Sequence, residues 1–278
     1  MRIVFAWLVL SLSALTLCEQ NLAVEIVAHR GASFDTPENT VSSMREGWKQ
    51  QADACELDIR LTQDGQIVLM HDESTKRTAR RDAKLEDQVF ADLRQLDAGQ
   101  WKGPQWTGEK IPTLAEALAT LPAGKRMFIE IKCGPEVLPE LERVLSASGK
   151  RPEQLVLIAF NAATLRLARE RFPKHPMLWI CSYKKDDKTG QFPQIGDLIR
   201  QAKAIGANGL DLNEKFPITA DFVAKVHAAG LELHVWTVDK ADTAQHLVAA
   251  GVDGITTNRP GWLRNELGHA AAKKGASR

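Results

Sequence analysis

Acidic side chains alternate with apolar ones in two short segments of the sequence, and this spacing suits a metal site. Glu56 and Asp58 lie two residues apart in the segment 54–61, and Glu130 has similar apolar neighbours in the segment 127–132. Successive side chains of a β-strand point to opposite faces, so the acids would share one face while apolar residues cover the other. Mg²⁺ and Ca²⁺ prefer such an all-oxygen ligand set. The pattern predicts one divalent cation, Mg²⁺ or Ca²⁺, bound by Glu56, Asp58 and Glu130.

A second interpretation of the same acids is a buried ion network without a metal. Arg30, Arg60 and Lys132 lie close to them in the sequence or on the same strands. Buried charges are normally paired or bound to metal, so either arrangement satisfies the acids. Both interpretations stay open on the pattern alone.

Two histidines end β-like segments in the half of the chain that holds the acids. They are His29, followed by Arg30, and His71. Histidine titrates near neutral pH and can take and give a proton in turn, which predicts catalytic roles for both. The guanidinium of Arg30 and the ammonium of Lys132 suit the binding of phosphate oxygens. With the divalent cation, these groups predict metal-assisted phosphoryl chemistry.

A tryptophan and a third histidine share one face of a later β-like segment. Trp236 is expected to line the pocket and bind substrate, although core packing explains it equally well. The remaining histidines lie in helical or loop segments and are expected to be solvated; they are His175, His227, His246 and His269.

The elements that must position these residues alternate between strand-like and helix-like patterns. The eight strand-like segments are Glu25–His29, Ala54–Leu61, Met127–Lys132, Leu155–Phe160, Met177–Ser182, Gly209–Asn213, Glu232–Val238 and Gly254–Thr257. Most are followed by an amphipathic helical pattern, namely Glu38–Gln50, Glu136–Ser148, Ala162–Phe172, Ile195–Ile205, Thr219–Ala229 and Lys240–Ala250. Strands separated by helices must be parallel. This rhythm predicts an α/β fold, a (β/α)8 TIM barrel, with a doubly wound open sheet as the alternative.

Local signals refine this organisation. Thr36-Pro37-Glu38 is expected to start the first helix. An insertion at about 62–110 follows the second barrel strand and includes a short extra strand at Ile67–His71. In a barrel this insertion, and the polar loop Lys184–Gly190, would lie on the face that carries chemistry.

Composition limits the possible functions. The chain has 278 residues, of which 44% are hydrophobic, so it is not disordered as a whole. Lys and Arg total 36 against 35 acids, which argues against a nucleic-acid or membrane coat because both need a basic excess. Cys55, Cys133 and Cys181 are too widely spaced for a disulfide framework and are expected to be buried thiols.

The N-terminal segment is typical of an export signal. Ile3–Leu17 is an uncharged run, too short to span a bilayer comfortably, and residues 1–23 are predicted to be a signal peptide. Cys18 lies in a sequence similar to a bacterial lipoprotein box, so a lipid anchor there is considered, as is an uncleaved helix. The expected location is periplasmic or extracellular. The barrel would occupy residues 24–268 and lack a transmembrane segment, and residues 269–278 would form a polar tail.

A series of short motifs, in order along the chain, carries a resemblance to a known enzyme family. They are His29-Arg30-Gly31, Pro37-Glu38-Asn39-Thr40, the run 56–65, Val68-Leu69-Met70-His71-Asp72, Ile111-Pro112-Thr113-Leu114, Ile129-Glu130-Ile131-Lys132, Val235-Trp236-Thr237-Val238 and Asp253-Gly254-Ile255. Together they resemble the signatures of the glycerophosphodiester phosphodiesterases.

The resemblance implies a (β/α)8 barrel that hydrolyses small glycerophosphodiesters to sn-glycerol 3-phosphate and an alcohol. It implies a divalent cation at the three acids, acid–base roles for His29 and His71, and phosphate contacts for Arg30 and Lys132. It leaves open which histidine is the acid, the oligomeric state, and whether water attacks directly or the glycerol 2-hydroxyl first forms a cyclic phosphate. Asn258, where the family usually has Asp, and Asn161 depart from the pattern, and both are expected to affect substrate fit rather than proton transfer.

Three other functions fit parts of the pattern. A phospholipase D-like enzyme acting on lipid head groups would need an exposed aromatic rim, whereas the loops are rich in charge. A phosphodiester-binding barrel that had lost its catalytic activity would be expected to lack His29, His71 or one of the three acids, and all of these residues are present. An aldolase using Lys132 would need a lowered amine pKa, which three nearby carboxylates oppose.

Overall fold

The computed structural model of the protein describes residues 24–276. The expected signal peptide at 1–23, including Cys18, lies outside the described residues. Among residues 24–276, no helix combines the length and apolar composition needed to cross a bilayer.

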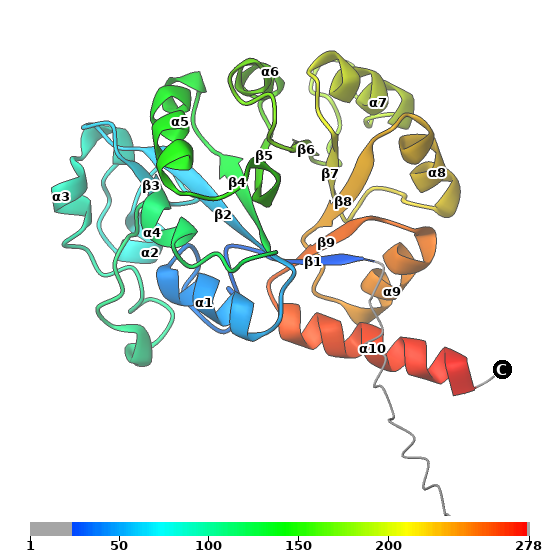
Figure 1. The fold of residues 1–278 in the computed structure, drawn as a ribbon, viewed down its shortest axis with the longest axis horizontal. Helices are drawn as coiled ribbons and strands as arrows, with labels where there is room; N and C mark the ends of the chain where they lie inside the picture. Colours follow the sequence, from blue (N-terminus) through cyan, green and yellow to red (C-terminus); the bar gives the residue numbers. More distant parts are fainter. Residues whose placement is uncertain (1–23, 277–278) are drawn as a thin grey trace, which may run out of the picture.

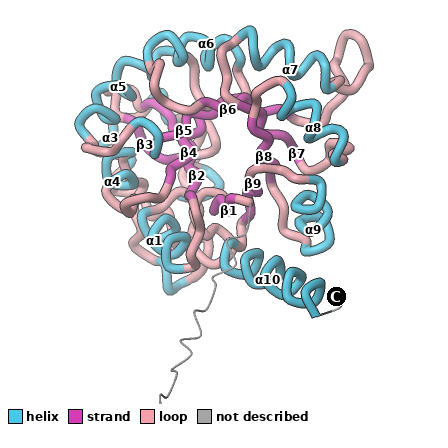
Figure 2. The backbone as a smooth tube through the Cα atoms, turned by 45° about the vertical axis from the view of Figure 1, so that its right-hand side comes forward, coloured by secondary structure: helices cyan, strands magenta, loops and turns pink. Residues whose placement is uncertain are grey.

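Eight parallel strands close into a barrel, which Figure 1 shows nearly end-on and Figure 2 from a turned view. They are β1 (Glu25–Ala28), β2 (Ala54–Leu61), β4 (Arg126–Ile131), β5 (Leu155–Ala159), β6 (Met177–Cys181), β7 (Gly209–Asn213), β8 (Glu232–Trp236) and β9 (Gly254–Thr257). Closure comes from the pairing of β1 with both β9 and β2. The (β/α)8 prediction is therefore confirmed, and the open-sheet alternative is wrong.

Helices surround the barrel and cover the outer faces of its strands (Figure 1). They are α1 (Val41–Lys49), α4 (Leu114–Leu118), α5 (Leu138–Ala147), α6 (Ala162–Arg171), α7 (Ile195–Ala204), α8 (Ala220–Ala228), α9 (Ala241–Ala250) and α10 (Pro260–Ala276). Short 3-10 turns, η3 (Pro135–Val137) and η4 (Pro152–Gln154), flank α5. α10 continues through most of the segment expected to be a polar tail.

The alternation in β2 divides its side chains between two environments. Leu57 and Ile59 are fully buried in the main core cluster beside residues of α1 and α4. A second, smaller cluster fills the barrel interior and includes Val27, Phe128 and Ile158. The acids of β2 therefore enter a dry interior, where charge is costly unless it is compensated.

The insertion after β2 forms a small layer on the barrel. β3 (Ile67–Leu69) pairs antiparallel with the end of β2. The rest contains the short helices α2 (Lys76–Ala79), η1 (Leu85–Asp87), α3 (Phe90–Leu93) and η2 (Pro104–Trp106). Val68, Leu85 and Leu93 belong to a separate apolar cluster that holds this layer together. The insertion is thus less irregular than the sequence indicates.

The first helix begins later than predicted. Asn39 has a left-handed backbone with φ of 57°, which stops any helix that would start at Thr36. Thr40 caps the helix instead, accepting a hydrogen bond from the backbone N–H of Ser43. The segment 36–39 is therefore a turn at the carboxyl end of β1, and its polar side chains are free to reach the site.

Candidate active site

The predicted functional residues converge at the carboxyl ends of the barrel strands. One cavity there is lined by His29, Arg30, Glu56, His71, Glu130, Lys132 and Trp236, which are seven of the eight candidates. The eighth, Asp58, is fully buried directly beside the two other acids. The structure therefore brings together all eight residues that the sequence analysis singles out.

The three acids lie together because β2 and β4 are paired in parallel. Asp58 and Glu130 are direct partners in the register of the two strands. Glu56, Asp58 and Glu130 each offer a carboxylate oxygen, and these oxygens all lie within 4.8 Å of one another. All three residues are buried, at 3%, 0% and 8% exposure. This is the convergence that the spacing predicts.

Two cations approach the acids without neutralising them fully. Arg30 Nε lies 3.3 Å from Asp58 Oδ2, and Lys132 Nζ lies 2.8 Å from Glu130 Oε1 and 3.8 Å from Asp58 Oδ1. Arg60 does not join them; its Nε donates to the backbone carbonyl of His71. The ion network with Arg60 as a member is therefore wrong, while Arg30 and Lys132 do pair with the acids.

Unsatisfied oxygens remain in the cluster. Among the described residues, Glu56 Oε1 and Asp58 Oδ1 are buried and have no hydrogen-bond partner. Burial and then the charge of Asp58 raise the pKa of Glu130 to about 7, and burial with the two neighbouring acids raises the pKa of Glu56 well above its usual range. A divalent cation fits this cluster, because it would satisfy the free oxygens of Glu56 and Asp58 and would favour the ionised forms of Glu56 and Glu130.

His29 is held in one tautomer by a contact that spans the barrel closure. Its Nδ1 lies 2.7 Å from Asn258 Oδ1, at the end of β9. The amide of Asn258 is oriented by Asp239, which accepts from its Nδ2 at 2.5 Å and from its backbone N–H at 2.9 Å. With Nδ2 turned to Asp239, the amide oxygen acts as an acceptor, both from Ser33 Oγ at 2.8 Å and from His29. Nδ1 of His29 therefore carries the proton, and Nε2 is the basic nitrogen.

The structure places Asn258 beside the predicted proton-transfer residues, whereas the sequence analysis sets it apart from them. It contacts a histidine proposed to move protons, and it does so from 229 positions away in the sequence. Closure of the barrel between β1 and β9 creates this contact. Asn161 has a local role: its side chain caps α6 by accepting from the backbone N–H groups of Ala163 and Thr164.

His71 is paired with a carboxylate instead of an amide. Its Nδ1 lies 2.7 Å from Asp72 Oδ1, and Asp72 Oδ2 accepts from Arg77 Nε at 2.6 Å. Burial opposes ionisation of Asp72, but its hydrogen bonds with Arg77 and His71 outweigh this and lower its pKa to about 2. Burial lowers the pKa of His71, and Asp58 and the hydrogen bond to Asp72 oppose that shift. A permanently ionised partner can stabilise His71 when it is protonated.

A chain of ion pairs connects this histidine to the acid cluster. Arg77 forms two hydrogen bonds of 2.8 Å with Glu38, and Glu38 also accepts from Arg30 at 2.8 Å. The insertion and the turn after β1 are thereby joined above the cavity. Asn39, next to Glu38, donates to Asp58 Oδ2 at 2.7 Å and accepts from the Asp58 backbone N–H at 3.0 Å.

The backbone beside the acids is tightly turned. Arg30 and Gly31 both have left-handed conformations, with φ of 53° and 79°. The turn is stabilised by the Arg30 N–H, which donates to Glu56 Oε2 at 2.8 Å. A Cβ atom on Gly31 would lie 2.4 Å from the backbone carbon of Ser43, so only glycine fits here. The turn brings Arg30 to the acids.

Aromatic side chains form part of the cavity wall and of its rim. Trp236 is half-buried, its Nε1 donates to the backbone carbonyl of Asp211, and its ring meets that of Phe160 edge-on at 5.6 Å. Phe34, Phe160 and Phe192 are exposed and follow β1, β5 and β6. The loops that the sequence analysis describes as rich in charge therefore also carry exposed aromatic side chains. Cationic side chains partly mask them, as Arg259 does 4.5 Å above Phe34.

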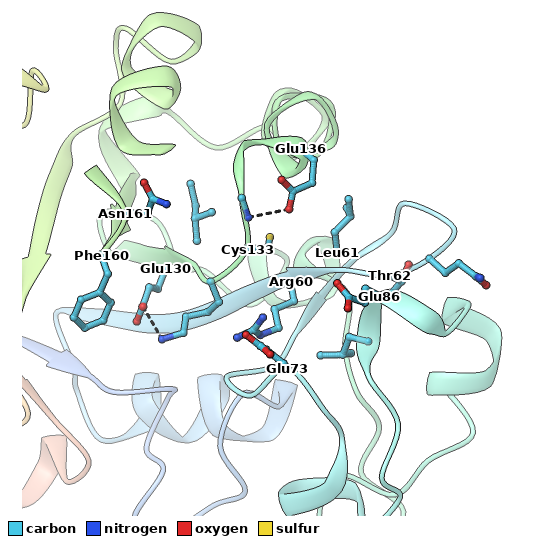
Figure 3. A pocket seen from close by; sticks show the side chains of 15 residues that line it. Arg60, Leu61, Thr62, Glu73, Glu86, Glu130, Cys133, Glu136, Phe160 and Asn161 are labelled. Carbon is cyan, nitrogen blue, oxygen red and sulfur yellow. Dashed lines mark hydrogen bonds and ion pairs between the residues drawn. The ribbon is translucent and has the colours of Figure 1, made fainter. Parts of the chain in front are cut away.

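A larger cleft lies beside this cavity, and Figure 3 shows the side chains that line the cleft. Glu130, Lys132 and Phe160 line both spaces. The cleft has a volume of about 700 Å³ and the cavity one of about 120 Å³. Arg60 and Glu73 face the cleft from the side of the insertion. The site thus offers a small compartment and a large one side by side.

The other histidines and the cysteines follow the predictions with two exceptions, His175 and Cys133. His227, His246 and His269 are exposed, whereas His175 is half-buried against Phe172. Cys55 and Cys181 are buried, Cys133 is half-buried, and all three are free thiols. Among the described residues none of them belongs to the acid cluster.

The sequence analysis did not identify several residues of the site as functional. Glu38, Asn39 and Asp72 stand inside the quoted motifs, so a signal for them was present. Arg77, Asp211 and Asp239 are charged residues whose contacts depend on folding. No local spacing in the sequence marks these three.

Comparisons with known proteins agree with this geometry. Residues 29–262 match the glycerophosphoryl diester phosphodiesterase family. A glycerophosphodiester phosphodiesterase of Caldanaerobacter subterraneus is 32% identical over 86% of this chain and 96% of its own length. One from Bacillus subtilis is 32% identical over 84% of this chain and 83% of its own.

Solved structures give the same result. A phosphodiesterase of Oleispira antarctica, solved with its product sn-glycerol 3-phosphate, has a TM-score of 0.79 and 27% identity, and the match covers 87% of this chain and 96% of that one. Because the family match spans most of the chain and the relatives exceed 30% identity over nearly their whole lengths, the chain belongs to the glycerophosphoryl diester phosphodiesterase family.

Proposed function

We propose that this phosphoric diester hydrolase cleaves glycerophosphodiesters to sn-glycerol 3-phosphate and an alcohol, using one divalent cation and the pair His29 and His71. The observation that carries the proposal is their convergence: both histidines line one cavity with two of the three clustered acids and with Lys132. Small glycerophosphodiesters supply the phosphate that such a site would bind. A nucleic-acid partner has no support in the balanced charge of the chain.

The phosphate would be held between the acid cluster and the two cations. Arg30 and Lys132 reach the cavity while they contact Asp58 and Glu130, so their remaining donors can bind phosphate oxygens. Glu56, Asp58 and Glu130 would hold Mg²⁺ or Ca²⁺, which would neutralise charge on the phosphate. In this arrangement the buried carboxylates do not repel the substrate.

The surroundings of the two histidines support different roles. Burial, and then the neighbouring Arg30, lower the pKa of His29 to about 4, so it is neutral at physiological pH with Nε2 free to accept a proton. We assign His29 as the base that takes the proton of the attacking hydroxyl oxygen. His71, paired with the ionised Asp72, would give a proton to the leaving alcohol oxygen as the bond from phosphorus to that oxygen breaks.

The pH profile tests this assignment. A general base works only when it is unprotonated, and with a pKa of about 4 His29 stays unprotonated down to about pH 5. With metal at saturation, the acidic limb of the kcat/KM profile is expected to lie below that pH, whereas an unshifted histidine as base would place that limb near pH 6.5. An acidic limb centred near 6.5 would contradict the assignment of His29.

A coupled assay for glycerol 3-phosphate release tests the function itself. Glycerophosphocholine, glycerophosphoethanolamine and glycerophosphoinositol would each be supplied with and without Mg²⁺ or Ca²⁺. We expect glycerol 3-phosphate from at least one of them. Cleavage of phospholipid head groups without release from any glycerophosphodiester would favour the phospholipase D-like alternative, and binding without turnover would favour a non-catalytic barrel. Release of a phosphorylated alcohol and free glycerol would contradict the proposed cleavage.

Export of the chain is a separate proposal based on its N-terminal residues. The uncharged run Ile3–Leu17 supports a signal peptide and a periplasmic or extracellular location, with a lipid anchor at Cys18 as a variant of the same proposal. Mass spectrometry of the N-terminus after expression in a bacterial host distinguishes cleavage near Ala23, a lipid-modified Cys18 and an intact Met1. The last result would overturn export by a cleaved signal.

A further inference from the structure

A buried carboxyl group on the far wall of the cavity takes no part in the proposed chemistry. Asp211 lies on β7, which is the fourth strand from β2 in either direction around the closed eight-stranded barrel and therefore faces it. Its side chain lines the same cavity as His29 and Lys132. The phosphate-binding groups and Asp211 thus face one another across a space of about 120 Å³.

The surroundings of Asp211 leave it without an obvious structural purpose. The residue is 4% exposed, and its Oδ1 is buried with no hydrogen-bond partner among the described residues. Its neighbours in the register are Ile180 and His234, and Ile158 also lines this part of the cavity. A buried polar atom without a partner normally costs stability, so its presence beside a cavity points to a ligand.

The position of Asp211 is also firmly set. Trp236 Nε1 donates to its backbone carbonyl at 3.1 Å, and the two strands are in register through Asn213 and Trp236. Thr256 also lines the cavity and is buried. The wall therefore presents an oriented acceptor in a mainly apolar surface, as specific small-molecule sites do.

The two compartments of the site suggest which part of the diester meets this wall. Every substrate of the proposed reaction carries the same glycerol group, whereas the alcohol varies. The constant group suits the small cavity of about 120 Å³, and the variable one suits the much larger cleft of about 700 Å³. With its phosphate at Arg30 and Lys132, the glycerol group would extend toward Asp211.

We propose that Asp211 accepts a hydrogen bond from a free hydroxyl of the glycerol group and so makes the site specific for glycerol on that side of the phosphate. This inference rests on the proposed function. It gives the unpaired Oδ1 a partner, and it accounts for a polar acceptor in an otherwise apolar wall.

Two other uses of Asp211 predict different behaviour. A cationic alcohol could be its partner, but burial raises the pKa of Asp211 to about 7, which weakens its negative charge at neutral pH while leaving it able to accept from a hydroxyl. Alternatively, Asp211 could serve only as a counter-ion for His234, its fully buried neighbour. That role would affect stability and not the choice of ligand.

Binding of the product and of a matched analogue tests the inference without requiring turnover. sn-Glycerol 3-phosphate and propyl phosphate, which lacks both hydroxyls, would be titrated calorimetrically into the metal-loaded wild type, Asp211→Asn and Asp211→Ala. Hydrogen bonds to charged groups predict a preference of about 10- to 100-fold for glycerol 3-phosphate in the wild type. The preference should nearly vanish in Asp211→Ala, and Asp211→Asn should keep part of it because an amide oxygen still accepts.

Controls separate the possible outcomes. Asn213→Ala, on the same strand but outside the cavity lining, should keep the wild-type preference. An unchanged preference in Asp211→Ala with a lower Tm would overturn the inference in favour of the His234 counter-ion. A selective loss of kcat/KM for glycerophosphocholine over glycerophosphoinositol in Asp211→Asn would overturn it in favour of cation binding.

The proposed function can fail separately. A wild type that binds glycerol 3-phosphate with the preference but hydrolyses no glycerophosphodiester would contradict the function and support the subsite. A wild type that hydrolyses these diesters but binds propyl phosphate equally well would overturn the role of Asp211 and leave the function standing.

Discussion

Replacing His29 or His71 with alanine is expected to lower kcat for glycerophosphodiesters by about 10²- to 10⁴-fold, because a positioned general acid or base contributes a factor of that size. Each imidazole has a different partner, Asn258 for His29 and Asp72 for His71, so neither can easily replace the other. Steady-state kinetics with saturating metal would measure the loss. The double variant should lose little more than the worse single variant if the two proton transfers belong to one step.

The matched control is His246→Ala. His246 is exposed on α9, where its Nε2 contacts the backbone carbonyl of Ile218 far from the cavity lining. Its kcat should stay near the wild-type value, and circular dichroism should show that all the variants are folded. A near-wild-type rate for His29→Ala or His71→Ala would remove that histidine from the mechanism.

The parts of the fold that could be predicted from the sequence depend on local periodicity. β2, β7 and β9 have the predicted bounds because buried strands alternate clearly and end at turns. Gly206, Gly230 and Gly251 follow helices with left-handed backbones, as helix ends favour. The start of α1 was mispredicted because Asn39, an L-residue, adopts a left-handed conformation that its type permits but does not require.

The acid cluster was predictable for the same reason, whereas the contacts that hold the neighbouring side chains in place were not. Glu56, Asp58 and Glu130 are brought together by alternation and by pairing of consecutive barrel strands, both of which the sequence indicates. The contact of His29 with Asn258 instead requires β1 to pair with β9. Asp211 reaches the cavity only because the barrel closes. Interactions across the closure have no periodic signal in the chain.

Removal of divalent cations is expected to have the other largest effect. EDTA should reduce hydrolysis below detection, and Mg²⁺ or Ca²⁺ should restore it, because three buried carboxylates would otherwise face the substrate phosphate. Glu56→Gln keeps the shape of the side chain and removes one ligand charge, so it should lose most activity or require much more metal. Glu153→Gln, at an exposed glutamate in η4 outside the linings of the cavity and the cleft, is the matched control and should behave like the wild type.

Thermal unfolding decides between the cation and the metal-free ion network. A bound cation stabilises the folded state by about 2.7 kcal/mol at a concentration 100 times its Kd, so metal should raise the Tm of the wild type and raise that of Glu56→Gln much less. Without metal the variant should be at least as stable as the wild type, because the variant no longer buries a carboxylate oxygen that lacks a partner. Glu56→Gln should therefore be at least as stable as the wild type in EDTA and less stable in metal. If the ion network is complete without metal, EDTA should change neither the Tm nor the activity of the wild type. Glu56→Gln would then be less stable than the wild type both with and without metal, because the Arg30 N–H that donates to Glu56 Oε2 would lose a charged acceptor.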